Sequence, residues 1–330
     1  MNSALYGHGG FFHRPEGPGG HFRTSAHTTT MFATAVLRLL DHVDRSLGHP
    51  RRLDVVDLGA GRGELLLAIR ACTDDTELGS RLRLHAVELA AAPAHWTDEI
   101  AWSTDPPDDV TGLVIANEWL DNVPVDVVRA ADDGPERVLV DPVDGSEVPG
   151  GPIGLLDAGW LARWWPLAGQ PAGSRAEIGL ARDRAWERAV ATVDRGLALA
   201  IDYGHTRIER ENGMLAHGTL TGYRDGRMVA PVPDGSCDVT AHVAIDACAH
   251  AGITAGARST RILRQREALR ALGLSGALPP VELASIDSAG YAYAILQANE
   301  AAELLDPDGL GGFWWLAQSV GVELPSPLAR

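Results

Sequence analysis

The chain has 330 residues, of which 45% are hydrophobic and 22% are charged, and its formal net charge is −16. It is long enough to bury a full core, with room for one large domain and an insertion, and too apolar for wholesale disorder. Because phosphate binding requires a cationic surface, the charge argues against a nucleic-acid partner and suits a cationic one. All 28 basic residues are arginine, which excludes lysine Schiff-base chemistry.

Residue types also argue against several other classes of protein. The three cysteines form no C-x-x-C pair, so neither a disulfide framework nor a zinc site is expected. The histidines near the N-terminus, His8, His13, His21 and His27, match no compact ligand motif, and we expect no metal. Residues 1–30 lack the basic and apolar regions of a signal peptide, and no apolar run reaches membrane-spanning length. We therefore expect a cytoplasmic protein without a membrane partner.

The first part of the chain alternates between helices and strands. Residues 1–26 are rich in Gly, His and Pro, which predicts a flexible tail or a loop ordered by what it covers. Met31 to Leu47 has the apolar spacing of a helix, and the threonines before it offer N-caps. Strand and helix then alternate at 53–58, 64–72, 82–88 and 112–116. This order predicts an α/β fold, a parallel sheet with helices on both faces.

The most informative stretch is Leu-Asp-Val-Val-Asp-Leu-Gly-Ala-Gly-Arg-Gly at residues 53–63. A short apolar strand, with an acidic residue near its end, runs into a glycine-rich turn, and a helix follows at once. Glycines let the backbone approach a ligand closely, and the helix N-terminus presents free N–H groups to it. The residues predicted to contact such a ligand are Asp57, Gly59, Ala60, Gly61, Arg62 and Gly63.

The spacing of the glycines narrows the choice of ligand. The dinucleotide fingerprint of NAD and FAD sites, G-x-G-x-x-G/A, requires a small residue at its last position, where this chain has Glu64. A Walker A loop requires a lysine, and the chain has none. The remaining pattern, D-x-G-x-G-x-G, resembles that of class I S-adenosylmethionine (SAM) methyltransferases. The alternative is a structural strand–helix turn that binds no cofactor.

A second acidic residue follows the next strand. Arg81 to Val87 alternates apolar and polar residues, which predicts a strand, and the strand ends at Glu88. A carboxylate there can accept hydrogen bonds from both ribose hydroxyls of a nucleoside. We place Leu89 beside it among the predicted cofactor contacts. The alternative is a solvated glutamate at a strand end.

Polar residues also follow the third predicted sheet strand, within Ile115 to Pro124. Because strand C-termini gather at the ligand crevice, Asn117 is predicted to contact the methionine part of the cofactor. Glu118 and Asp121 could hold a guanidinium by charge-assisted hydrogen bonds, and we predict both as catalytic residues. The alternative is a helix start, with Asn117 as the N-cap and both carboxylates favouring the helix dipole.

The second half of the chain mixes hairpins and helices. Two β-rich runs at 123–131 and 137–140 predict a hairpin, and an insertion rich in Gly, Pro and Trp begins at 142. The other predicted elements are helices at 175–193, 239–251, 260–272 and 281–304, a buried strand at 197–201 and a hairpin at 214–231. The buried strand leads into Asp202-Tyr203-Gly204, which is either a turn or part of a substrate cleft.

Taken together, these motifs resemble the MidA-type family of SAM-dependent methyltransferases over nearly the whole chain. The matching segments are 20–27, 57–63, 87–88, 116–124, 201–204, 218–220 and 237–243. The resemblance implies a Rossmann-like, doubly wound sheet of the class I SAM-methyltransferase type, with an N-terminal helical and loop extension and an inserted α+β subdomain. The implied segments are a cofactor-covering segment with a helix at 1–50, the SAM-binding half at 51–141, a substrate or partner insertion at 142–195, and the remaining catalytic domain at 196–330.

The resemblance also implies an activity, because mitochondrial members of the family are protein arginine methyltransferases that act in respiratory complex I assembly. It implies SAM as the cofactor, with Thr24 and Ser25 among its contacts, and a cationic protein as the partner. The residues implied at the substrate cleft are Phe22, Asp202, Tyr203, Gly204 and His242.

Three positions depart from the family pattern. His21 and His27 replace acidic residues, and Gly226 stands about where a histidine is usual. Two alternatives therefore stay open beside protein arginine methylation. One is methylation of a small molecule, and the other is a non-catalytic SAM-binding assembly factor that recognises a partner through the insertion.

Overall fold

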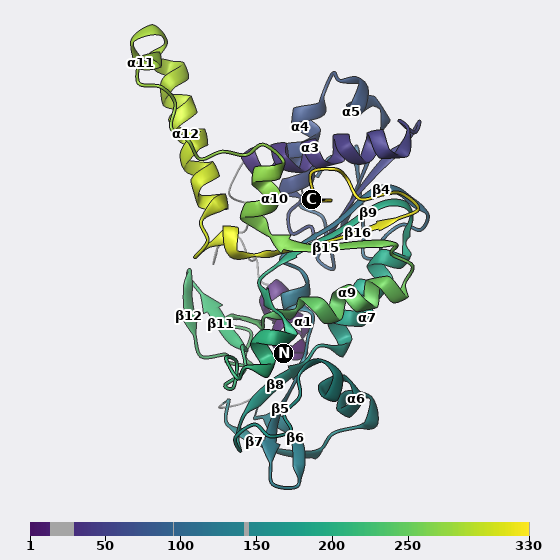
Figure 1. Cartoon of the computed structure of the whole chain (residues 1–330), viewed down its shortest axis with the longest axis vertical. Coiled ribbons are helices and arrows are strands. Elements are labelled where there is room, and N and C mark those ends of the chain that lie inside the picture. The colour runs from purple at the N-terminus through teal and green to yellow at the C-terminus, as the bar shows by residue number, and fades with distance from the viewer. Residues whose placement is uncertain (14–29, 95, 142–144, 330) are drawn as a thin grey trace. The chain divides into compact units, whose positions relative to one another are not determined.

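The computed structural model describes residues 1–13, 30–94, 96–141 and 145–329 (Figure 1). By spatial contact these residues divide into two compact units. The sheet unit comprises 30–117, Thr192–Ile201 and 256–329, and the insert unit comprises 1–13, Glu118–Ala191 and Asp202–Ala255. The four functional segments expected from the sequence stay a prediction.

The sheet unit is built on seven strands in the order β15-β16-β9-β4-β1-β2-β3. Their bounds are β1 (Leu53–Leu58), β2 (Leu82–Val87), β3 (Ile100–Ser103), β4 (Val110–Asn117), β9 (Val193–Asp202), β15 (Ser259–Arg264) and β16 (Trp314–Val320). The five strands from β9 to β3 run parallel, and β15 is antiparallel to β16. The predicted α/β class with a mostly parallel sheet is therefore confirmed.

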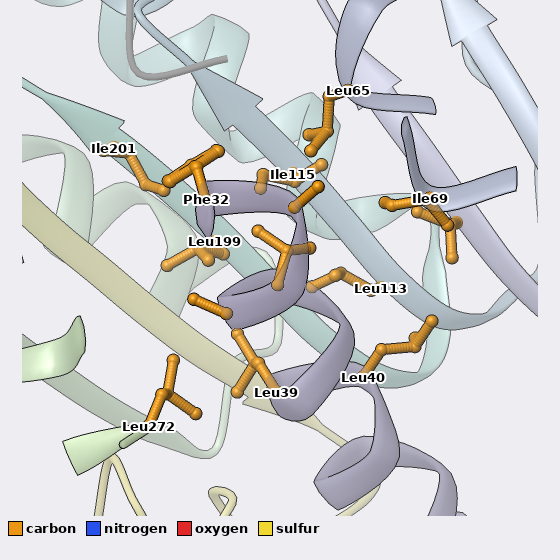
Figure 2. Close-up of a cluster of buried hydrophobic side chains, with 14 of the residues drawn as sticks. Phe32, Leu39, Leu40, Leu65, Ile69, Leu113, Ile115, Leu199, Ile201 and Leu272 are labelled. Carbon is orange, nitrogen blue, oxygen red and sulfur yellow. The ribbon is translucent and has the colours of Figure 1, made fainter. Parts of the chain in front are cut away.

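Helices and one 3-10 turn complete the sheet unit. Their bounds are α3 (Thr30–Leu47), α4 (Glu64–Thr73), α5 (Glu77–Arg81), α10 (Gln265–Ala271), α11 (Leu283–Ile286), α12 (Ser288–Leu305) and η4 (Leu310–Gly312). The apolar side chains of α3, among them Phe32 and Leu39, pack against Leu113 and Ile115 of β4 and Leu199 of β9 (Figure 2). The helix expected in this region is therefore confirmed. Its apolar side chains recur at helical spacing and cover one face of the sheet.

The insert unit combines small sheets with short helices. Its helical elements are α1 (Asn2–Tyr6), η1 (Phe11–His13), η3 (Leu120–Asn122), α6 (Leu155–Trp164), α7 (Leu180–Ala191), α8 (Arg207–Glu211) and α9 (Ile245–Thr254). Its strands are β5 (Asp126–Ala131), β6 (Gly134–Val140), β7 (Glu147–Pro152), β8 (Arg175–Ile178), β10 (Gly204–His205), β11 (Thr221–Arg224), β12 (Arg227–Val229), β13 (Asp238–Thr240) and β14 (Val243–Ala244). The sheets are ordered β7-β6-β5-β8, β12-β11-β13 and β10-β14, and both predicted hairpins are present.

Three of the predicted helices begin as strands instead. The runs at 175–193, 239–251 and 260–272 start with β8, β13 and β15, and only their later residues form helices. Each of these strands pairs with a strand distant in sequence, β8 with β5 for example. A short apolar run fits both the helical and the strand period, and this tertiary pairing decides between them.

The predicted helix at 281–304 is broken, and several other elements were not predicted. The break lies at Asp287, whose side chain accepts the Gly290 N–H and caps α12. Among the unpredicted elements are α6 and β16, of ten and seven residues, and the shorter α5 and β3, of five and four residues. The shorter two give too few residues for a periodic pattern.

Gly112 is a position where the parallel register leaves little room for a side chain. It lies opposite Asp54 on β1 and Gly196 on β9, and an added Cβ would lie 2.1 Å from the Asp54 carbonyl oxygen. We expect Gly112→Ala to lower the free energy of unfolding by about 1–3 kcal/mol, because strand spacing must yield. Gly159→Ala in α6, where an added Cβ meets nothing within 4 Å, should instead gain about 0.5–1 kcal/mol. Denaturant titration measures both changes, and a Gly112→Ala protein as stable as the wild type would contradict this register.

Candidate active site

A tight loop joins β1 to α4 in the sheet unit. Gly59, Gly61 and Gly63 have φ values of +70°, +60° and +83°, which glycine adopts without strain. The N–H groups of Gly59 and Ala60 both donate to the Val87 carbonyl oxygen, at 2.9 and 3.2 Å. The loop therefore extends the pairing of β1 with β2 beyond the ends of the two strands.

The glycines of this loop differ in the space around them. Among the described residues, a Cβ on Gly61 would have Glu64 Oε2 at 3.6 Å as its one neighbour within 4 Å. A Cβ on Gly63 would lie 2.1 Å from the Trp96 ring. A ligand can therefore approach the backbone at Gly61 closely. At Gly63 a glycine is needed because any side chain would clash with the Trp96 ring.

Glu88 holds the loop to the turn that follows β2. Its Oε2 accepts the Gly61 N–H at 3.1 Å, and its Oε1 accepts the N–H groups of Leu89 and Ala90 at 2.7 and 3.2 Å. A carboxylate has about four acceptor positions, so about one is left for a hydroxyl donor. The structure therefore brings the predicted residues Gly61, Glu88 and Leu89 together.

Asp57 is buried at the end of β1, with an exposed fraction of 5%. Burial, followed by the negative charges of Glu64 and Glu88, raises the pKa of its carboxyl to about 8. At pH 7 this carboxyl is therefore mostly protonated. A positive charge bound nearby would favour the ionised form and lower the pKa again.

Two tryptophans that sequence reasoning missed connect the Glu88 turn with the glycine loop. Trp102 on β3 donates its indole N–H to the Ala90 carbonyl oxygen at 3.0 Å. Its ring packs edge-on against Trp96, with centroids 4.7 Å apart, and Trp96 contacts Gly63. The pair was missed because β3 was not predicted, although two tryptophans six residues apart were a visible signal.

Asn117 ends β4, the strand on the other side of β1. The pairing of Leu58 with Ala116 puts Asn117 one residue past the end of β1, and its side chain is buried. The alternative interpretation makes Asn117 the N-cap of a helix, but the N-cap of the η3 turn that follows is Trp119. Asn117 and the glycine loop lie at the carboxyl edge of adjacent strands, where open α/β sheets bind ligands.

In the insert unit, three buried carboxyl groups lie near one another. Asp121, Asp202 and Asp238 have exposed fractions of 3%, 1% and 2%. Asp202 accepts the Asp121 backbone N–H at 3.1 Å, while the hydroxyls of Tyr203 and Thr240 donate to the Asp121 carboxylate. Within the described ranges, Asp121 Oδ1 and Asp202 Oδ1 have no hydrogen-bond partner.

Repulsion and burial set the protonation of these groups. Burial, followed by the charges of Asp121 and Glu118, raises the pKa of Asp202 well above its usual range. Burial and the charge of Asp121 likewise raise the pKa of Asp238. A further positive charge brought near either carboxyl would favour its ionised form and lower its pKa again.

Arg182 is the buried cation of this region. Its guanidinium donates to four backbone carbonyl oxygens at 2.5–3.0 Å, those of Asp121, Val123, Ala241 and His242. These acceptors are neutral, so the hydrogen bonds hold the backbone in place and form no ion pair. The positive charge of Arg182 also lowers the pKa of Asp202 through space. The carboxyl groups nearby outnumber this one positive charge.

The other predicted site residues are distributed as follows. Glu118 is the first residue of the Glu118–Ala191 segment of the insert unit, and its φ of +51° is a conformation that non-glycine residues rarely adopt. The rings of Tyr203 and His242 pack edge-on with centroids 5.2 Å apart, and Gly204 pairs with Val243. The predicted residues Phe22, Thr24 and Ser25 lie outside the described residues.

Two general features complete the description of the site. Across the described ranges, no helix combines the length and apolar character that crossing a membrane requires. In the same residues, no group of three or more His, Cys, Asp or Glu side chains is arranged to hold a metal ion.

The profile of a family described as "Putative S-adenosyl-L-methionine-dependent methyltransferase" matches residues 33–263. The chain belongs to this family. It is therefore a SAM-dependent methyltransferase, and SAM is its methyl donor. The matched range includes the glycine loop, Glu88 and the buried carboxyl groups of the insert unit. No curated protein matches the chain.

Two crystal structures of COG1565 superfamily proteins from Burkholderia thailandensis are similar to the whole chain of this methyltransferase. One, bound to S-adenosyl-homocysteine, is 26% identical with a TM-score of 0.81, and the match covers 100% of this chain and 89% of that chain. The other, a native structure, is 26% identical with a TM-score of 0.80, covering 100% and 88%. The class I SAM-methyltransferase fold expected from the sequence is thus confirmed.

Gly61 gives a direct test of where the methyl donor binds. We expect Gly61→Val to abolish measurable SAM binding, because a β-branched side chain would fill the open space and strain a left-handed backbone. Gly169→Val is the matched control, since Gly169 also has positive φ, +80°, and open space around it. Calorimetric titration measures both variants. Wild-type affinity in folded Gly61→Val would refute the placement of SAM on this loop.

The raised pKa of Asp57 predicts proton release when SAM binds. At pH 7 the free carboxyl is mostly protonated, and a sulfonium bound beside it should drive the proton off. The release should vanish above pH about 9, where Asp57 is already ionised. Calorimetry in two buffers of different ionisation enthalpy counts the protons. Asp57→Asn should release none, and an unchanged proton count in that variant would assign the release to another group.

Proposed function

We propose that this methyltransferase modifies an arginine side chain of a protein partner, the activity implied by its resemblance to the MidA-type family. The observation that carries the proposal is the surplus of carboxyl groups in the insert unit. Asp121, Asp202 and Asp238 are buried there together, and two of their oxygens have no hydrogen-bond partner among the described residues. A guanidinium offers five N–H donors in a fixed plane, which suits oxygens of this kind.

Glu118 supports the same proposal. It follows Asn117, the last residue of β4, directly in the chain, and its negative charge contributes to the raised pKa of Asp202. Its positive φ is a strained conformation of the kind that clusters at functional sites. We assign Glu118 to aligning the acceptor guanidinium, and we assign Asp121, held by Tyr203 and Thr240, to supporting that contact.

The sheet unit would supply the methyl-donor site. The Burkholderia relative binds S-adenosyl-homocysteine, the form that SAM takes after giving up its methyl group. We infer that the open backbone at Gly61 and the Glu88 carboxylate of this chain hold the same group. When bound, SAM supplies an electrophilic methyl group with its own leaving group. The protein then has to position the acceptor and exclude water.

In this proposal the carboxyl groups stabilise the positive charge of the acceptor. An arginine guanidinium is protonated at neutral pH and must pass one proton to a nearby carboxylate or to water as the new N–CH₃ bond forms. Carboxylates near it stabilise the cation before transfer and the methylated cation after the proton has left. The net charge of −16 also favours encounter with a basic protein segment.

The test uses radiolabelled SAM, the purified full chain and two acceptor pools, a protein fraction and a small-molecule fraction of the same lysate. We expect label in protein, recovered as methylarginine after hydrolysis. Label confined to small molecules would replace the proposal with small-molecule methylation. SAM binding without transfer to either pool would favour a non-catalytic assembly role.

Glu118→Gln tests the assigned residue. The variant keeps the size of the side chain and removes its charge, so SAM affinity should stay within about threefold while turnover falls at least about tenfold. Glu211→Gln is the control, because Glu211 forms a surface ion pair with Arg207 at 2.6 Å. Wild-type turnover in Glu118→Gln would remove Glu118 from this role.

A further inference from the structure

The sheet unit carries an apolar arm, residues 278–297, that comprises α11 and the first half of α12. Figure 1 shows α11 and α12 extending away from α3 and α10. The buried residues of α12 all lie in its second half, namely Ala298, Ala301, Leu304 and Leu305. The exposed large side chains of the arm are Leu278, Val281, Ile286, Tyr293 and Leu296, with exposed fractions of 59–83%. The second half of α12 therefore anchors an arm whose apolar side chains remain exposed.

One face of α12 in the arm is apolar and exposed. Ala289, Ala292, Tyr293 and Leu296 are all exposed and stand at positions i, i+3, i+4 and i+7. This spacing puts them on a single helix face, with two small residues nearest the helix start and two large ones after them. When two copies of the helix run antiparallel, the small residues of one copy lie opposite the large residues of the other, so the face is complementary to itself.

The charge of the arm limits what can cover this face. Only two of its twenty residues are charged, Glu282 and Asp287, against 22% in the whole chain, and none is basic. A helix that lies on an anionic membrane carries basic residues on its polar face, so lipid is disfavoured. A basic protein partner would be recognised by carboxylates, but the Asp287 side chain is used to cap α12.

We propose that this face of α12 binds the same face of a second copy of the chain, around a two-fold axis. Tyr293 and Leu296 of each copy pack over the alanines of the other, which is the reciprocal pattern of a two-fold interface. Two chains of net charge −16 repel each other, and they meet through a segment of low charge. The arm residues would bury on the order of 1,000 Å² in total, the lower end for a specific interface, so dissociation in the micromolar range is expected.

Association is measured by sedimentation of the full chain between about 1 and 100 µM, a range set by that expected affinity. Wild type should shift from monomer to dimer, and Leu296→Glu should stay monomeric throughout, because it buries a charge against the alanines of the other copy. Ile253→Glu is the matched control, since Ile253 on α9 is an exposed apolar residue, 51% exposed, outside the arm. A monomeric wild type at 100 µM, or a dimer unaffected by Leu296→Glu, would overturn the proposal.

Cross-linking tests the pairing without adding charge. In a Cys72→Ser background, Ala292→Cys should form a reducible dimer under mild oxidation, because Ala292 lies next to the centre of the face and therefore next to the two-fold axis and its own copy. Ala302→Cys, exposed on the same helix but about 120° around from Leu296, should not. Equal cross-linking of both variants would show random collision. Binding of wild type to lipid vesicles in place of self-association would assign the face to a membrane.

Discussion

The site in the sheet unit depends on how the glycine loop satisfies its backbone donors. Beyond the end of β1, the N–H groups of Gly59 and Ala60 share the Val87 carbonyl oxygen, and that of Gly61 donates to Glu88. A donor left without a partner in such a loop costs about 1–3 kcal/mol, so the loop keeps this shape only while β1 and β2 stay in register. The apolar contacts of α3 with the sheet maintain that register. The same Glu88 carboxylate is then available, with one acceptor position, to a ligand hydroxyl.

Carboxyl groups with raised pKa values occur in both units, and their consequence for stability has a definite sign. The pKa of Asp57 is raised to about 8, and those of Asp202 and Asp238 are also raised, in each case first by burial. A carboxyl whose pKa is higher in the folded state contributes stability below its unfolded pKa and loses it as pH rises through the folded value. For Asp57 that loss falls between pH about 4 and about 8. Near neutral pH these carboxyl groups therefore lower the free energy of unfolding of the ligand-free protein. A bound cation offsets that loss by favouring their ionised form.

The sequence predicted the parallel sheet and the glycine loop because both are local patterns. Strands β1 and β4 are mostly buried runs and β2 alternates between buried and more exposed residues, while the loop is defined by three glycines within five residues. The strands β8, β13 and β15 were missed because their state is decided by pairing with distant strands, which an apolar run does not reveal. The tryptophan pair and the buried contacts of Arg182 were missed for a related reason. Both link segments that are adjacent only in the folded chain.

The departure from the family pattern at Gly226 has a local structural reason. Gly226 and Asp225 form the two-residue turn between β11 and β12, with φ values of +71° and +52°. A turn with positive φ at both central residues strongly favours Asp-Gly, and a histidine in place of the glycine would strain it. The glycine therefore follows from the hairpin, and its presence says nothing against a guanidinium as acceptor. In the proposed function, charge recognition instead depends on Glu118 and on the buried carboxyls of Asp121, Asp202 and Asp238. Under the proposed function, acceptor preference comes from the surplus of carboxyl groups inside the insert unit, which a change at a hairpin tip leaves intact.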